Sequence, residues 1–200
     1  VVSVSLANTT VDQIVAESDN FVRVVAGHDL VGAVGDVRLV SDSGAIVYLS
    51  NGWTSLAEGA VNLVVPSSGQ IGTRVTIQGR SFFGGGSSII SVKFGDVFGG
   101  IVSSNDSLIV AIVNRSSLVG PCGIEIVSNS GAIIRSQNNS WTYLAEGVIS
   151  SVTPASGQIG TRVTIDGSRL LGGGSSFSAA ILVGIRCSSI SEQSNTRVVC

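Results

Sequence analysis

Few residues in this 200-residue chain are of the types that carry out chemistry. His28 is the only histidine, so any catalytic triad or Cys-His pair would have to use this one ring. It lies in the short polar stretch 26–29, which we expect to be a surface loop between strands. The acidic residues are scattered, and none has the spacing of an EF-hand calcium loop. We therefore expect no catalytic residue, no cofactor and no metal site, and we interpret the chain as a non-enzyme.

Two glycine-rich stretches, at residues 84–86 and 172–174, have the composition of phosphate-binding loops. A P-loop also needs a Lys directly after its last Gly, followed by a helix. Here two serines follow each glycine triplet, and a β-prone segment comes next. We interpret both stretches as flexible loops between strands.

The composition predicts an all-β protein. Hydrophobic residues reach 44%, but their runs are short, and a membrane-spanning helix needs about 20 apolar residues in a row. The apolar residues are mostly Val and Ile, which favour strands, and 26 glycines supply turns. The net charge of −2 lacks the basic footprint of a nucleic-acid-binding protein. We therefore expect no membrane span in this segment and no nucleic-acid partner.

An internal repeat is the strongest signal in the chain. The sequence GQIGTRVTI at residues 69–77 returns at 157–165, and LAEG at 56–59 returns at 144–147, in both cases 88 residues later. The complete unit is then residues 60–147. Residues 1–59 form the back part of a preceding unit, and residues 148–200 form the front part of a following one.

Both ends of the chain therefore fall inside a unit. The chain begins at Val1 without Met and shows no signal-peptide pattern, so we expect an internal or processed segment. One interpretation is that the 200 residues are a window on a longer array. The other is that each end completes its sandwich with a neighbouring chain, as in strand donation.

Within a unit, apolar and polar residues alternate with the period of a strand. Val75 and Ile77 alternate with polar residues, which places the apolar set on one face. Residues 37–48 predict a hairpin around a Gly-containing turn, and residues 124–134 repeat it. About seven short strands in fewer than 100 residues fit an immunoglobulin-type β-sandwich.

The segment VPSSGQIGTRVTIQGRSF at residues 65–82 resembles the opening of an IPT/TIG domain, and so does the segment that runs from Val152 to Gly167. The family pattern is a Pro, a Gly-containing turn, Gly-Thr, a Val-Thr-Ile strand, a Gly, and an aromatic or apolar residue. Phe82 fills that last position in one unit and Leu170 in the next. The resemblance implies tandem immunoglobulin-like β-sandwiches. It also implies three settings: cell-surface receptors, polysaccharide-active enzymes and DNA-binding transcription factors, the last of which the charge balance disfavours.

The three cysteines are interpreted with the help of this resemblance. Cys187 and Cys200 lie on neighbouring predicted strands and resemble the family's paired-Cys strands, so we expect a disulfide between them. The middle unit has Phe98 and Ala111 at the aligned positions and would lack that bridge. Cys122 is left over, either as a buried free thiol or as a bond to another chain.

The surface must remain soluble although charged residues make up only 12% of the chain, about half the usual share. Either glycans or neighbouring subunits can cover such a surface. Four Asn-x-Ser/Thr sequons fall at predicted turns or strand ends, at Asn8, Asn105, Asn114 and Asn138. We expect glycosylation there. Trp53 and Trp141 are expected to pack in the core or at junctions, with a carbohydrate-stacking platform as the alternative.

These features favour a structural repeat of an extracellular or cell-surface protein. The repeats are nearly identical at their junctions, and the linker that carries Glu58 or Glu146 is short. We expect each Glu to set the angle between units, with an interdomain calcium site as the alternative. The expected partners are copies of the same chain, assembled end to end or laterally into a fibre, stalk or coat, together with covalent glycans. The alternatives are a ligand-binding ectodomain of a receptor or adhesin, and a spacer module of a polysaccharide-active enzyme.

Glycosylation can be tested on protein purified from a eukaryotic source. We expect glycopeptides at one or more of Asn8, Asn105, Asn114 and Asn138, because each sequon falls where a strand is expected to turn. Peptide mass spectrometry before and after enzymatic release of N-glycans measures occupancy at each site. Unmodified peptides at all four positions would remove the glycan hypothesis.

Overall fold

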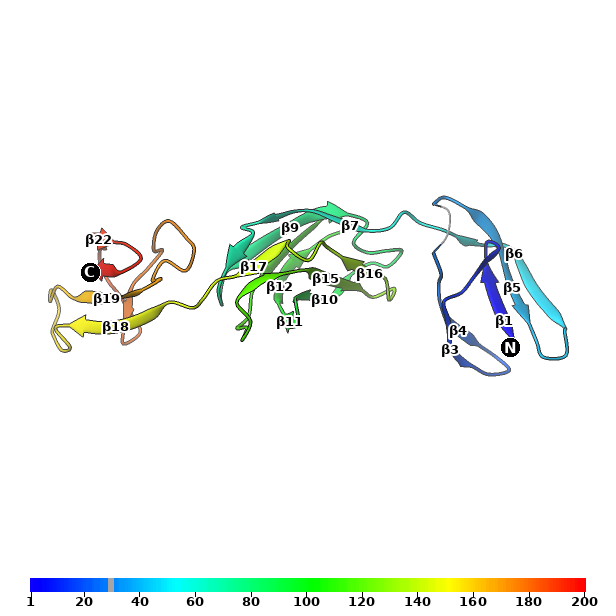
Figure 1. Cartoon of the computed structure of the whole chain (residues 1–200), viewed down its shortest axis with the longest axis horizontal. Coiled ribbons are helices and arrows are strands. Elements are labelled where there is room, and N and C mark those ends of the chain that lie inside the picture. The colour runs from blue at the N-terminus through cyan, green and yellow to red at the C-terminus, as the bar shows by residue number, and fades with distance from the viewer. Residues whose placement is uncertain (29–30) are drawn as a thin grey trace. The chain divides into compact units, whose positions relative to one another are not determined.

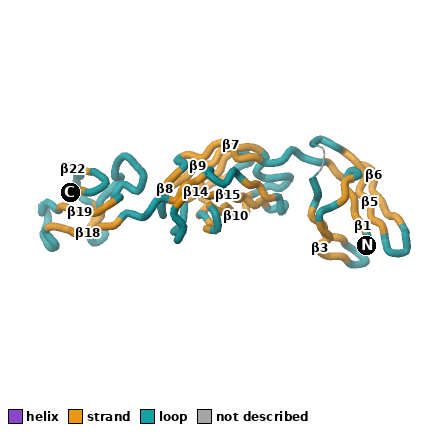
Figure 2. Tube along the Cα trace, in the orientation of Figure 1, coloured by secondary structure: helices purple, strands orange, loops and turns teal. Residues whose placement is uncertain are grey.

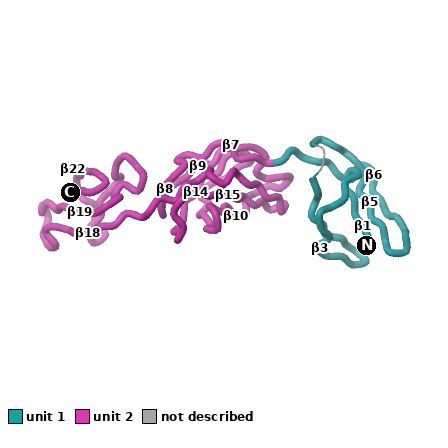
Figure 3. The backbone as a smooth tube through the Cα atoms, in the orientation of Figure 1, with its two compact units in different colours: residues 1–58 teal, residues 59–200 magenta. Residues whose placement is uncertain are grey.

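The computed structural model describes residues 1–28 and 31–200, and every regular element in them is a β-strand (Figure 2). In this described part of the chain, no helix has the length and apolar character needed to cross a membrane. The chain divides into two compact units, Val1–Glu58 and Gly59–Cys200 (Figure 3). The prediction of an all-β fold is confirmed.

Residues 60–143 of the second unit form a closed two-layer sandwich (Figure 1). One layer has the strand order β12-β13-β9-β7, and the other has the order β11-β10-β15-β16, with a third short sheet ordered β14-β17-β8. The strands are β7 (Ala60–Val65), β8 (Ser68–Gly69), β9 (Arg74–Arg80), β10 (Ile89–Phe94), β11 (Val97–Phe98), β12 (Gly100–Ser104), β13 (Leu108–Ile112), β14 (Gly120–Cys122), β15 (Ile124–Ser128), β16 (Ile133–Arg135) and β17 (Trp141–Tyr143). The repeated hairpin expected at residues 124–134 is the β15–β16 pair.

The core of this sandwich follows from the period-two alternation along its strands. Burial alternates along β9 and along β15, so each strand turns one apolar row inward. The two rows meet in one cluster in which Ile77 and Ile126 are fully buried. Trp141 is also fully buried and makes edge-to-face contacts with Phe94 and Tyr143, at ring-centroid distances of 5.4 and 5.8 Å. The expectation of core packing is confirmed for Trp141.

A close backbone approach explains the glycine in the repeated motif. A Cβ atom on Gly79 would overlap the carbonyl oxygen of Ala60 and the ring of Phe82. Gly167 is in the same position in the next unit, where a Cβ atom would meet Val148 and Leu170. The absence of a side chain at this glycine therefore allows the apolar side chain three residues later to pack directly against the backbone of the paired strands.

Residues 148–200 fold as the front part of a second sandwich. The strand order β18-β19-β23-β22 reproduces β7-β9-β13-β12, and β20 pairs with β21 as β10 pairs with β11. The strands are β18 (Val148–Thr153), β19 (Thr164–Ser168), β20 (Ile181–Leu182), β21 (Ile185–Arg186), β22 (Glu192–Gln193) and β23 (Arg197–Val199). Its smaller core centres on Val163, Ile165 and Val198. Tandem immunoglobulin-like sandwiches are thus the architecture of this unit.

The cysteines of this part lie in adjacent segments. Cys187 and Cys200 form a disulfide with a Cα–Cα distance of 5.9 Å. The amide of Cys187 donates to the carbonyl of Ala180, and in the middle sandwich the amide of Gly99 donates to Val92 in the same way. The position equivalent to Cys187 is therefore Gly99 rather than Phe98, and Gly99 cannot form a bridge either.

The first unit, Val1–Glu58, has strand pairings like those of the later strands of the middle sandwich. It contains a sheet of order β2-β1-β5-β6 and the hairpin β3–β4, and Val4 and Leu6 of β1 are buried. The strands are β1 (Ser3–Leu6), β2 (Thr9–Thr10), β3 (Gln13–Glu17), β4 (Val22–Val25), β5 (Val34–Val40) and β6 (Ile46–Thr54). In β5–β6, Val40 pairs with Ile46, just as Val127 pairs with Ile133 in β15–β16.

Substitution of Gly79 by Ala tests the close approach. The added methyl group meets a backbone oxygen and an aromatic ring that are both fixed in the core, so we expect a loss of about 1–3 kcal/mol in unfolding free energy. Urea unfolding followed by Trp141 fluorescence, in a Trp53→Phe background, measures it. Gly100→Ala is the control, because its Cβ would have only the Ile112 oxygen nearby, at 3.9 Å. Equal stability of the two variants would contradict this account of the motif.

Candidate interdomain junction

The exit from the middle sandwich is fixed by strand pairing. Strand β17 runs parallel to β8, with Thr142 opposite Ser68 and Tyr143 opposite Gly69. The next amide, that of Leu144, donates to the Gly69 carbonyl at 2.7 Å. The linker at residues 144–147 therefore starts alongside the loop that carries the repeated GQIGT motif.

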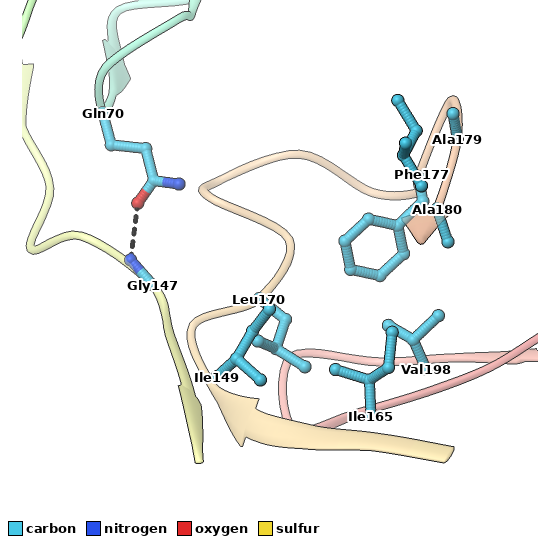
Figure 4. A pocket seen from close by; sticks show the side chains of 10 residues that line it. Gln70, Gly147, Ile149, Ile165, Leu170, Phe177, Ala179, Ala180 and Val198 are labelled. Carbon is cyan, nitrogen blue, oxygen red and sulfur yellow. Dashed lines mark hydrogen bonds between the residues drawn. The ribbon is translucent and has the colours of Figure 1, made fainter. Parts of the chain in front are cut away.

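This loop presents the side chain of Gln70. The amide of Gln70 donates to the Thr73 hydroxyl at 3.1 Å, and the Thr73 amide returns a bond to the Gln70 carbonyl. Gly72 adopts a φ of 85°, a conformation that favours glycine. The Gln70 Oε1 atom then accepts the amide hydrogen of Gly147 at 2.8 Å (Figure 4). The start and the end of the middle repeat are held together at the point where the next domain begins.

Glu146 contacts side chains on both sides of the linker. Its carboxylate pairs with the Arg115 guanidinium at 3.0 Å, and its backbone oxygen accepts a hydrogen bond from Arg169 Nε at 3.1 Å. Arg115 belongs to the middle domain and Arg169 to the following one. The Arg115–Glu146 pair is largely exposed and contributes at most about 1 kcal/mol to stability.

The glycine triplet at residues 172–174 lies against the end of the middle domain. A Cβ atom on Gly172 would come within 2.6 Å of Gln70 Nε2, and one on Gly173 within 2.7 Å of Leu144 Cδ1. Both glycines also have positive φ values, 60° and 91°. The expectation of a flexible loop therefore missed this contact, in which the glycines allow one domain to approach the next closely.

His28 takes part in a similar arrangement within Val1–Glu58. Its Nδ1 atom lies 2.8 Å from the Glu58 carboxylate, and both side chains are exposed. Glu58 precedes Glu146 by 88 residues, and His28 precedes Arg115 by 87. The surface position of His28 agrees with the sequence-based expectation. The sequence analysis did not predict the His28–Glu58 pair, although both residues precede the Arg115–Glu146 pair by nearly one repeat.

The four sequon asparagines are all exposed. Asn114 differs from the other three, because its amide nitrogen, where a glycan would be attached, already donates a hydrogen bond. Asn105 accepts hydrogen bonds at Oδ1 from the amides of Ser107 and Leu108, which leaves its amide nitrogen outside this turn. Asn114 uses its amide nitrogen to donate to the Phe98 carbonyl at 2.8 Å. Asn8 has a φ of 69° in the turn between β1 and β2, and Asn138 lies in the turn before β17.

Cys122 is a free, partly buried thiol in β14. Burial, and then the negative charge of Asp96, raise the pKa of this thiol. Burial, and then Cys122, raise the pKa of Tyr143 to about 12. Both groups are therefore neutral near neutral pH, and the Cys122 thiol is a poor nucleophile.

A cavity of about 320 Å³ adjoins the junction, and it is lined mainly by apolar side chains of residues 148–200 (Figure 4). Phe177, Leu170 and Val198 face one another across it, and Gln70 reaches its rim. In the described part of the chain, His, Cys, Asp and Glu residues do not gather into a possible metal site. The junction therefore combines an apolar cavity with a hydrogen-bonded linker.

Substitution of Gln70 by Ala tests the hydrogen bond at the junction. Loss of one such bond costs about 1 kcal/mol, so we expect hydrogen exchange at the Gly147 amide to accelerate roughly fivefold to tenfold. NMR-detected exchange at Gly147 measures the effect. Gln158→Ala is the matched control, because Gln158 has the same bond to a following Thr hydroxyl, and its side chain is exposed. Unchanged exchange in Gln70→Ala would show that the bond does not hold the linker.

Comparison with known proteins identifies the domain type. The family model for the IPT/TIG domain matches residues 60–143 and 148–200. A comparison with curated proteins finds no match.

Solved structures show weaker similarity. The plexin A4 extracellular region is 18% identical over 80% of this chain and 18% of its own length, with a TM-score of 0.47. The surface glycan-binding protein PbSGBP-B from Prevotella bryantii is 13% identical over 72% of this chain and 36% of its own, with a TM-score of 0.36. This chain therefore spans only a minor part of each of these proteins. The family model, in contrast, covers more than half of the 200 residues, and the chain belongs to the IPT/TIG domain family.

Proposed function

We propose that this chain is a non-enzymatic structural part of an extracellular or cell-surface array of IPT/TIG units. The units are residues 1–59, 60–147 and 148–200. The observation that carries the proposal is the junction, where Gln70 holds Gly147 and Glu146 contacts Arg115 and Arg169. Because the Gln70 loop and the LAEG linker each occur twice, 88 residues apart, the same step from domain to domain can recur. A step that repeats without closing builds a fibre or stalk.

An extracellular location is supported by the cysteine pair and by the surface. The Cys187–Cys200 disulfide is of a kind that persists in oxidising compartments. Asn8, Asn105 and Asn138 are exposed at turns where a glycan can be attached. Many apolar side chains are exposed, and few residues are charged. N-glycans or neighbouring copies can cover this apolar surface and keep it soluble.

The side chains that carry chemistry in enzymes are used differently in this chain. The histidine is on the surface, where it is bound to Glu58. The free thiol of Cys122 has a raised pKa, and the cavity near Gln70 is lined by apolar side chains without an acid or base. These features support a role in which the surface and the joints, rather than a catalytic centre, perform the function.

Electron microscopy of the native material tests this proposal. We expect regular fibres or a coat whose axial repeat corresponds to one or two units, because nearly identical junctions repeat one rotation and translation. Removal of N-glycans before imaging serves as a second arm, in which we expect lateral clumping as apolar surface is uncovered. Monodisperse short rods that bind a specific ligand would contradict a structural role and would favour a receptor ectodomain.

A further inference from the structure

One outer face of the middle sandwich is apolar. Val64, Ile77 and Ile109 are buried beneath the sheet β12-β13-β9-β7, so the residues that alternate with them along its strands face outward. The aliphatic residues among these outward positions are Leu63 and Val65 from β7, and Leu108, Val110 and Ile112 from β13. Both sheets of this sandwich lie within residues 60–143, so this face is the outside of a complete domain.

Strand pairing brings these aliphatic residues together. Leu63 and Leu108 pair with Gln78 from its two sides, and the neighbouring row is built in the same way around Thr76. Leu63 is 49% exposed, so much of its side chain is in contact with water. An exposed apolar patch on a soluble protein is either a contact surface or a risk of aggregation. The face therefore needs an occupant.

The next repeat has the same face with polar residues. The row that corresponds to that of Leu63 consists of Ser151, Asp166 and Arg197. There, Arg197 Nε donates to Asp166 Oδ1 at 2.7 Å. Thr153 replaces Val65 in the neighbouring row. The apolar character is therefore a property of the middle domain and is not required by the fold.

The two repeats also differ at the turn that borders this face. Asn105 begins the turn between β12 and β13, and its Oδ1 atom accepts hydrogen bonds from the amides two and three residues later, at 2.9 and 2.8 Å. Ser194 has the same place in the next repeat, and its hydroxyl accepts the two equivalent bonds. The turn is thus the same, but only Asn105 belongs to a sequon. Sequon and apolar face occur together in one repeat and are both absent from the other.

We propose that an N-glycan on Asn105 covers the outer face of the sheet β12-β13-β9-β7. The turn uses Oδ1 of the exposed Asn105 side chain, and Nδ2, which would carry the glycan, makes no hydrogen bond with the described residues. Leu108, at the end of the same turn, is the first outward residue of β13. This strand is 5 residues long, or about 17 Å, which a few linked sugars can span.

The charges on this face favour a glycan over a second copy of the chain. Arg74 and Arg80 face outward at the two ends of β9, and the outward residues of this sheet include no acid. Neither arginine forms an ion pair with the described residues. Two such faces packed together would bring like charges close, whether their β9 strands ran parallel or antiparallel. Neutral sugars avoid this repulsion, and their hydroxyls can accept hydrogen bonds from the guanidinium groups.

This inference rests on the proposed extracellular location, and it identifies which apolar surface a glycan covers. Oxidative footprinting of the full chain, secreted from eukaryotic cells, tests it. Ser107→Ala removes the sequon and keeps both backbone bonds to Asn105. Labelling of Leu63 and Val65 should rise roughly twofold or more in this variant, because labelling follows the apolar area open to water. Ile133 is the internal reference, since it is 50% exposed, as Val65 is, and lies at the edge of the other sheet.

A rescue experiment provides the second measurement. The Ser107→Ala chain should bind more of a hydrophobic fluorescent dye than the glycosylated chain. Addition of Leu63→Ser and Val65→Thr, which introduces the residues of the next repeat, should reverse this gain. Both sites are about half exposed, so these substitutions should not unfold the domain. Ser140→Ala is the matched control, because it removes the sequon at the turn before β17 and should leave Leu63 labelling unchanged.

An unmodified Asn105 peptide in the secreted protein, or equal labelling of Leu63 with and without the glycan, would overturn the inference. Self-association of the glycosylated chain that Leu63→Ser and Val65→Thr abolish would also overturn it, since a second copy would then be the occupant. None of these results bears on the end-to-end array, which the electron microscopy tests separately.

Discussion

Burial of two apolar sheet faces against each other is the interaction on which the rest of this structure depends. In the middle domain, Ile77 from one sheet and Ile126 from the other are fully removed from water, and Trp141 fills the space between the sheets. Each such side chain contributes about 1.5–3 kcal/mol when it is buried. In residues 148–200 a four-stranded sheet faces only the β20–β21 pair, and in Val1–Glu58 a four-stranded sheet is accompanied only by the β3–β4 pair.

The junction is a consequence of this core. Trp141 and Tyr143 anchor β17 in the sandwich, and β17 in turn pairs with β8 beside the Gln70 loop. The linker therefore leaves the domain at a fixed place, where a single side-chain carbonyl can hold it. The next domain's glycine triplet has space to pack there because Gly172 and Gly173 lack side chains. The packing of the core thus determines where the linker starts, and the position of the linker determines where the next domain makes contact.

Much of this architecture could be predicted from the sequence because repeats and period-two alternation are local signals. The spacing of 88 residues indicated the units, and the hairpins at residues 37–48 and 124–134 were recognisable from their turns. The partners at the junction were not recognisable. Gln70 and Gly147 are far apart in the sequence, and only the fold brings them together.

Small changes in repeat spacing account for the other differences. The β1 and β10 strands are related by 88 residues, β5 and β15 by 87, and β13 and β23 by 89. An alignment without the strand pairing therefore placed Phe98, rather than Gly99, opposite Cys187. The glycine triplets suggested flexibility because glycine allows many backbone conformations. The sequence does not indicate which residues pack against the triplets.

Native-state hydrogen exchange on the dilute, monomeric chain tests the central claim most directly, since it measures the closure of each sandwich separately. The account predicts that the slowest amides lie in β9, β13 and β15 of the middle domain and exchange together in one cooperative unfolding event. Amides of β4, β5 and β19, beside the open faces, should exchange faster by orders of magnitude. Equal protection across all three parts, or faster exchange in the middle domain, would contradict it.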